Sequence, residues 1–245
     1  MKNKIIYLAF LVITLTSYSQ TGKEARANKD YDKYAYIDAI KTYEKVAEKG
    51  YKSAPMFQKL GNAYYFNGEI DKASKWYKDL FDLNEEVEPE YYFRYSQSLK
   101  SVKDYDKADK MMEKFFELTN DYRGEMYVKN KMYLTEIVDQ LDKYKIEDAG
   151  INSKESDYGS YFFNQKMYFV TSRKPTKIKS NIDKWTNQNY SNLMSVQFDP
   201  NSNLRPVYID EETDEINTKY HESSLVFTKD GETVYFTRNN FNSNA

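Results

Sequence analysis

The chain has 245 residues, of which 40% are hydrophobic and 30% charged, and its formal net charge is −2. This composition is typical of a soluble globular protein, and the length favours two domains. With 36 basic and 38 acidic residues there is no overall basic field, which argues against nucleic acid and anionic membranes as partners. There is no cysteine and one histidine, His221, so disulfides and thiolate metal sites are excluded.

The first twenty residues predict an export signal. Lys2 and Lys4 precede an uncharged apolar run at residues 5–16, and the small residues Ser17 and Ser19 follow where a signal peptidase would cut. A bilayer span requires about 20 apolar residues, so this run is short for a permanent anchor. The alternative is a buried N-terminal helix. We expect residues 1–20 to be removed and the mature chain to lie outside the cytoplasm, with no transmembrane span.

Residues 21–143 are predicted to form stacked helical hairpins, because one pattern recurs along them. Ala39, Ala73 and Ala108 lie 34 and 35 residues apart. Each follows an acidic residue and precedes a large apolar residue four positions on. A small residue at a crossing lets two helices approach, and stacking buries the apolar stripes that one hairpin leaves open. An ordinary helical bundle is the alternative, and residues 121–142 are expected to form one closing helix.

The middle unit resembles the tetratricopeptide repeat, whose pattern is matched by Leu60, Gly61, Tyr64, Gly68, Ala73 and Tyr77. The outer two units match in part, and the third has Lys103 where the turn glycine would be. Three units are about the minimum for a stable stack, and end units are expected to be atypical.

In such repeats the first helix of each hairpin lines a concave groove, and the resemblance implies equivalent inner positions here. The predicted protein-binding residues are Asn28, Tyr31, Asn62, Tyr65, Phe66, Phe93 and Gln97. Amide side chains can hold an extended peptide by its backbone, and aromatic rings supply anchor area. The alternative is that these side chains contact water or the next domain. Glu24 stands where one lysine of a carboxylate clamp would be, so recognition of a C-terminal carboxylate is not expected.

Residues 144–245 show the period-two alternation of strands. Segments 156–173 and 222–238 are alike, each with a strand, a tight turn, a second strand and a basic end, and another hairpin is expected between 192–198 and 204–209. The second segment resembles a TolB-type β-propeller blade, which is matched by Glu222, Ser223, Phe227, Asp230, Gly231, Val234, Tyr235, Phe236, Thr237 and Arg238. The fold class is therefore α+β multidomain, with a tetratricopeptide-like α-solenoid followed by the first blades of a β-propeller.

The order of these parts resembles the OmpA-family envelope proteins of Bacteroidetes, some of which belong to the type IX secretion and gliding machinery. A propeller has about 4–8 blades, more than this chain provides, and an open sheet edge invites aggregation. We therefore hypothesise that the chain is the leading part of a longer protein. The resemblance implies a periplasmic, outer-membrane-associated scaffold that binds subunits of such a complex and reaches peptidoglycan through a C-terminal domain beyond this sequence.

No catalytic, cofactor-binding or metal-binding residue is predicted, and we expect the protein not to be an enzyme. The acidic run 210–215 lacks the spacing of a calcium loop, His221 is expected to be structural, and Trp185 lies in a loop as an anchor or a cap. Two alternatives to the scaffold remain open. One is a chaperone-like module for exported proteins, and the other is a propeller enzyme acting on a glycan or peptide.

Overall fold

The computed structural model describes residues 22–175, 181–197, 207–208 and 216–239. The predicted export signal and the acidic run 210–215 lie outside these ranges. The chain divides into two compact units, the first running to Lys143 and including Lys184–Thr186, the second containing Tyr144–Asp183 and the residues from Asn187 onward.

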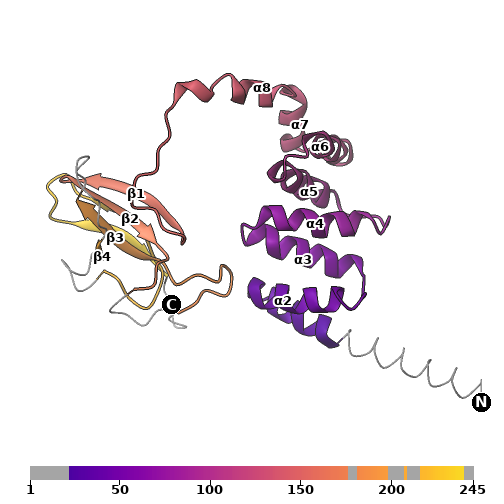
Figure 1. Cartoon of the computed structure of the whole chain (residues 1–245), viewed down its shortest axis with the longest axis horizontal. Coiled ribbons are helices and arrows are strands. Elements are labelled where there is room, and N and C mark those ends of the chain that lie inside the picture. Colours follow the sequence, from indigo (N-terminus) through magenta and orange to yellow (C-terminus); the bar gives the residue numbers. More distant parts are fainter. Residues whose placement is uncertain (1–21, 176–180, 198–206, 209–215, 240–245) are drawn as a thin grey trace, which may run out of the picture. The chain divides into compact units, whose positions relative to one another are not determined.

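The first unit is an array of antiparallel helices (Figure 1). Residues 22–31 are helical. The helices that follow are α2 (Tyr36–Ala47), α3 (Ala54–Phe66), α4 (Ile70–Phe81), α5 (Pro89–Ser101), α6 (Tyr105–Thr119), α7 (Tyr122–Lys129) and α8 (Tyr133–Val138), then a 3-10 turn (Leu141–Lys143). Across the ranges that the structure describes, none of the helices combines the length and apolar character needed to cross a bilayer.

The alanine period predicted for the hairpins is confirmed. Ala39, Ala73 and Ala108 are each 0% exposed, so all three lie inside the helix stack. The close approach is clearest at Gly61 of α3, where an added Cβ would lie 2.6 Å from a ring carbon of Tyr77 on α4. Real Cβ atoms do not tolerate such a contact, so this crossing requires glycine.

The turns between the two helices of each hairpin share one backbone geometry. Tyr34, Gly68 and Lys103 occupy the same repeat position and have φ of 59°, 84° and 65°. In each turn the next residue donates its N–H to the carbonyl five positions back, at 2.9 to 3.0 Å. The left-handed position favours glycine, yet it is kept where the sequence has tyrosine or lysine. The third unit therefore follows the repeat despite its missing turn glycine.

The prediction of one closing helix over residues 121–142 is wrong. The segment is broken into α7, α8 and the 3-10 turn, with Asn130 ending α7. Only Gly124 and Tyr127 of α7 are buried, and α8 buries no residue. Short helices gain most of their stability from packing, so a continuous helix would have had no surface to hold it.

The second unit contains two antiparallel sheets. β1 (Asp157–Phe163), β2 (Lys166–Thr171), β3 (Asn192–Gln197) and β4 (Val207–Tyr208) form one sheet in that order, and β5 (Glu222–Phe227) pairs with β6 (Val234–Arg238) in the other. The predicted hairpins β1–β2 and β5–β6 are confirmed, and β3 pairs with β4 as expected, although residues 198–206 lie outside the described ranges. The described strands do not make a closed propeller, so the blade assignment stays a prediction.

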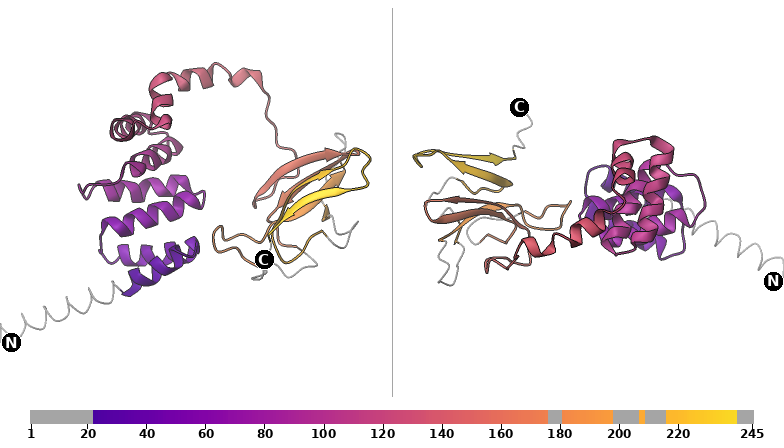
Figure 2. Two further views of the ribbon diagram at one scale, coloured as in Figure 1. Left: turned by 180° about the vertical axis from the view of Figure 1, so that it is seen from behind. Right: turned by 90° about the horizontal axis from the view of Figure 1, so that it is seen from above.

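A separate buried cluster lies on each face of the four-stranded sheet. On one face the β5–β6 hairpin lies across the sheet (Figure 2), and Tyr168, Val170 and Leu193 form a buried cluster with Ile216 and Leu225. A second buried cluster consists of Ile151, Met167, Phe169, Met194 and Val196. Side chains alternate along a strand, so these two clusters lie on opposite faces of β2.

Hairpins β1–β2 and β5–β6 also share irregular features. Each has a register shift, between Tyr158 and Tyr161 in β1 and between Ser223 and Val226 in β5. At the shift stand Gly159 with φ 63° and Ser224 with φ 42°, which are 65 residues apart. Such a bulge bends a strand at a defined position, so its recurrence shows a structural repeat.

An acid–arginine pair fastens each hairpin at its open end. Arg173 Nη2 lies 2.9 Å from Asp157 Oδ2, and Arg238 Nε lies 3.0 Å from Glu222 Oε1. Each guanidinium also donates to a backbone carbonyl in the segment that leads into its hairpin, and the acceptors are Ile151 and Ile216. The acids, the arginines and the isoleucines of the two hairpins are each 65 residues apart.

Candidate protein-binding face of the helical unit

Two predicted amides make hydrogen bonds to neighbouring helices of the array. Asn62 on α3 is 6% exposed, and its Oδ1 accepts hydrogen bonds from Tyr77 Oη and Arg94 Nη1, both at 2.8 Å. One repeat earlier, Asn28 Oδ1 accepts from Tyr43 Oη at 2.6 Å. Burial raises the pKa of both tyrosines, so the phenols stay protonated and donate. These asparagines therefore position helices and neighbouring side chains.

Around Asn62 the structure gathers four aromatic side chains and one arginine, all half-buried except Phe66, which is exposed. We call this group, which consists of Tyr31, Tyr65, Phe66, Tyr91 and Arg94, the aromatic–arginine face. Asn62, Tyr65 and Phe66 fall three and four residues apart on α3, and Tyr91 and Arg94 three apart on α5, which puts each set on one side of its helix.

The members of the face contact one another directly. Arg94 Cζ lies 4.9 Å from the Phe66 ring centroid and 5.9 Å from that of Tyr91. The rings of Tyr65 and Phe66 meet edge to face at 5.8 Å. Burial raises the pKa of Tyr31, Tyr65 and Tyr91, and hydrogen bonding to Asn62 offsets part of the rise at Tyr31 and Tyr91. Phe66 is 37% exposed, so the face keeps apolar surface open to solvent.

A chain of ion pairs borders the face. Glu90 lies between two guanidinium groups, 3.4 Å from Arg94 Nε and 2.9 Å from Arg123 Nη2. Arg123 also pairs with Asp121 at 3.0 Å. The hydrogen bonds that Arg123 donates to Asp121 and to Glu90 raise the pKa of Arg123, and the same Arg123 guanidinium lowers the pKa of Asp121. The positive charges of Arg94 and Arg123 are thus already paired with carboxylates. The groups that can contact a partner are the aromatic rings and the tyrosine hydroxyls.

The structure brings together four of the seven predicted residues, namely Tyr31, Asn62, Tyr65 and Phe66. Phe93 instead packs on Phe115 at 5.4 Å and under Arg123 at 4.3 Å, in the next cluster along the array. Gln97 is half-buried further along α5. Tyr91 and Arg94 were not among the residues predicted from the sequence. The spacing of Glu90 and Arg94, four residues apart with opposite charges, is the signal that could have found them.

Trp185 belongs to the first unit and packs beside Phe66. Its ring stacks on Tyr34 at 5.7 Å and meets Tyr36 edge to face at 5.1 Å. The indole Nε1–H donates to the Phe66 carbonyl oxygen at 2.7 Å. The aromatic side chains next to the face therefore accommodate an indole, with a backbone carbonyl that satisfies its N–H.

His221 has a structural environment, as expected. Its Nδ1 accepts the Ser191 backbone N–H at 3.1 Å and its ring stacks on Tyr190 at 4.0 Å. Burial lowers the pKa of His221, which agrees with a neutral imidazole whose Nδ1 is an acceptor. No group of three or more His, Asp or Glu side chains suited to a metal ion occurs among the residues described.

Comparison with known proteins identifies part of the helical array. The family model described as tetratricopeptide repeat matches residues 54–87 and 89–122. Among curated proteins no significant match to this sequence was found. A solved structure to which the chain is similar is the type III secretion translocator chaperone SycD of Yersinia enterocolitica. The two share 19% identity over 51% of this chain and 90% of that chain, with a TM-score of 0.34. Two units of the helical array, from α3 to the start of α7, are therefore tetratricopeptide repeats, which are typically modules for protein interaction.

Proposed function

We propose that the helical unit binds an extended segment of a partner protein on the aromatic–arginine face. The observation that carries this proposal is the convergence of Tyr31, Tyr65, Phe66, Tyr91 and Arg94 around the buried Asn62 amide. Half-buried tyrosines and arginines are the side chains enriched at the energetic centres of protein interfaces. Asn62 holds the arrangement, and the rings make the contact.

The expected partner segment carries apolar or aromatic anchors instead of a charged terminus. Arg94 and Arg123 already pair with Glu90 and Asp121, so an added carboxylate would have to displace an existing ion pair. Ring faces and phenol hydroxyls accept apolar side chains and peptide groups without that cost. Trp185 beside Phe66 provides an example of such an anchor.

The test uses the full chain on an array of random 12-residue peptides. We expect bound peptides to be enriched in aromatic and large aliphatic residues. A Tyr65→Ala/Tyr91→Ala double variant should lose binding about tenfold or more, because truncating such anchors usually costs more than 1 kcal/mol each. Tyr122→Ala is the matched control, since this tyrosine on α7 is 67% exposed. Equal binding by the double variant and the wild type would refute the proposal.

For the whole protein we propose the setting that the sequence resemblance implies. The chain is a periplasmic scaffold, associated with the outer membrane, that links an envelope complex of the secretion or gliding type to the cell wall. The predicted export signal and the blade-like strand segments support this proposal. Capture from an envelope extract with the full chain tests it. One fixed partner, lost in the double variant, is the expected result, and a broad set of unfolded clients would favour the chaperone-like alternative.

A further inference from the structure

The short segments that lead into β1 and β5 are equivalent parts of the second unit. Ile151–Asn152 precedes the acidic residue of β1 by the same distance as Ile216–Asn217 precedes that of β5. In both segments the isoleucine carbonyl accepts the hairpin arginine. In both, a hydroxyl that follows the asparagine, from Ser153 or Thr218, donates to the acid. The two asparagines therefore stand at the same point of the repeat.

In the second copy this asparagine clamps the backbone of a strand. Asn217 Oδ1 accepts the Leu193 N–H at 2.7 Å, and Asn217 Nδ2 donates to the Leu193 carbonyl at 2.9 Å. Asn217 is 6% exposed, and Ile216 beside it is buried in the same cluster as the Leu193 side chain. One amide thus satisfies both backbone groups of an apolar residue in β3, as a neighbouring strand would.

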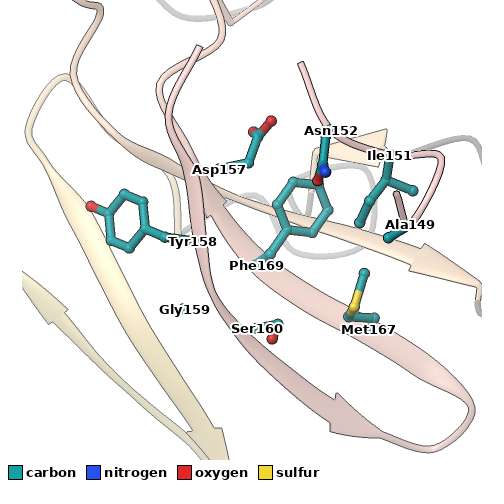
Figure 3. Close-up of a pocket in the computed structure, with 9 residues that line it drawn as sticks. All are labelled: Ala149, Ile151, Asn152, Asp157, Tyr158, Gly159, Ser160, Met167 and Phe169. Carbon is teal, nitrogen blue, oxygen red and sulfur yellow. The ribbon is translucent and has the colours of Figure 1, made fainter. Parts of the chain in front are cut away.

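In the first repeat, the equivalent asparagine before β1 holds none of the described strands. Asn152 is exposed, and its amide has no hydrogen-bond partner within the described ranges of the chain. It lines a cavity of about 190 Å³ (Figure 3), whose lining includes Ile151, Met167 and Phe169, which are 7%, 6% and 3% exposed. By strand register the last two correspond to Val234 and Phe236 of the second copy. There these equivalent residues pack against the buried cluster of the four-stranded sheet.

We propose that the cavity beside Asn152 is a docking site for a β-strand, in which the Asn152 amide pairs with the backbone N–H and C=O of an apolar strand residue. The side chain of that residue and its neighbours fill the cavity. This site is distinct from the aromatic–arginine face of the helical unit and goes beyond the function proposed for it.

The occupant to which we commit is a strand of another sheet of this same repeat. The interface between β3 and the Asn217 segment is the filled form of the site, and the Asn152 segment presents the same groups at the same spacing. The strand should therefore resemble β3, with an apolar residue such as Leu193 between small polar or flexible neighbours. Its backbone must be free at that residue, because recognition is through the amide.

The test measures binding of a labelled peptide with the sequence of residues 190–197 (YSNLMSVQ) to the full chain. Fluorescence anisotropy gives the affinity, and the side-chain NH₂ resonances of Asn152, assigned from an Asn152→Asp spectrum, report the contact directly. We expect saturable binding that shifts these resonances. Asn152→Ala should weaken the affinity about tenfold or more, since two hydrogen bonds are lost. A peptide methylated on the Leu193 nitrogen should weaken in the same way.

Lys154→Ala is the control, because this side chain is 91% exposed and lies two residues from Asn152. It should bind like the wild type, and retained β1–β2 amide resonances in every variant will show that the sheet is intact. Absence of saturable binding at millimolar peptide would overturn the proposal. So would equal binding by Asn152→Ala or by the methylated peptide. If the full chain self-associates and Asn152→Ala abolishes this, the occupant is instead a second molecule of this protein.

Discussion

At the scale of single residues, Lys103 shows a cost that the repeat imposes on one side chain. Its φ of 65° is left-handed, as at Gly68 with 84°. A residue with a Cβ is strained there by about 1–2 kcal/mol, and the greater freedom of glycine in the unfolded chain offsets part of the relief. We expect Lys103→Gly to raise the free energy of unfolding by roughly 1 kcal/mol, measured by urea denaturation of the full chain followed by helical circular dichroism.

Lys110→Gly is the matched control for this substitution. Lys110 is exposed inside α6, where glycine should lower stability by about 1 kcal/mol relative to a good helix former. Opposite signs at the two lysines would show that the turn conformation is the cause. A loss of stability in Lys103→Gly would contradict the argument.

Single residues also show what the sequence could predict of the candidate face. The alanines were found because close packing leaves few residue types for a crossing, and the same spacing identified the hairpins. The role of Asn62 was not predictable in this way. Whether an amide faces a ligand or a neighbouring helix depends on Tyr77 and Arg94, which are distant in sequence and meet it only in the folded array.

At the scale of elements, Asp157 anchors the β1–β2 hairpin through its charge. Burial alone would raise the pKa of this carboxyl, but hydrogen bonds from Thr171, Ser153 and Arg173 outweigh it and lower the pKa. A depressed folded pKa means that ionised Asp157 stabilises the fold above its unfolded pKa of about 3.9, and that this stability is lost as pH falls through the folded value.

Asp157→Asn should therefore destabilise the sheet by about 1–3 kcal/mol at pH 7, the range for hydrogen bonds to a charged group. The difference from wild type should shrink as the pH falls below about 4. Urea titration followed by the amide resonances of β2 at several pH values measures both. If the difference in free energy of unfolding between wild type and variant stays constant over this range, the charge of Asp157 is not the cause.

The equivalent residue of the other hairpin supplies a control of opposite sign. Burial raises the pKa of Glu222, with hydrogen bonds from Thr218 and Arg238 offsetting part of the rise. An acid whose pKa is higher in the folded state stabilises the fold below its unfolded pKa, and this stability is lost as pH rises through the folded pKa. The stability of Glu222→Gln relative to the wild type should therefore increase as pH rises. For Asp157→Asn the relative stability should decrease over the same change.

Elements in the strand half were predictable for a different reason than those in the helical half. Alternation and the Asp230–Gly231 turn located the hairpins, because a strand exposes its two faces in turn. The prediction over residues 121–142 failed because composition alone does not show whether a helix has a surface to pack on. The Asn152 and Asn217 pair was readable from the spacing of 65, but its task depends on a strand that contacts only one of them.

At the scale of the whole molecule, the chain leaves α8 and enters the strand unit through a segment that makes few packing contacts. The described residues 139–150 are all exposed, with Tyr144 at 76% and Ile146 at 92%. α8, which precedes this segment, buries no residue. Such a stretch opens locally at little cost, while α3 and β2 open only with their units.

Limited trypsin digestion of the full chain should therefore cut after Lys143 or Lys145 well before it cuts inside α3 or β2. The reason is that a protease needs an extended segment of backbone, and the accessible population of the open form sets the rate. Mass spectrometry of early time points identifies the site. A Lys143→Gln/Lys145→Gln variant should slow this cut severalfold and leave the other early cuts unchanged. Early cleavage within α3 or β2 at a comparable rate would mean that the buried clusters of the two units do not hold them folded independently of the segment between them.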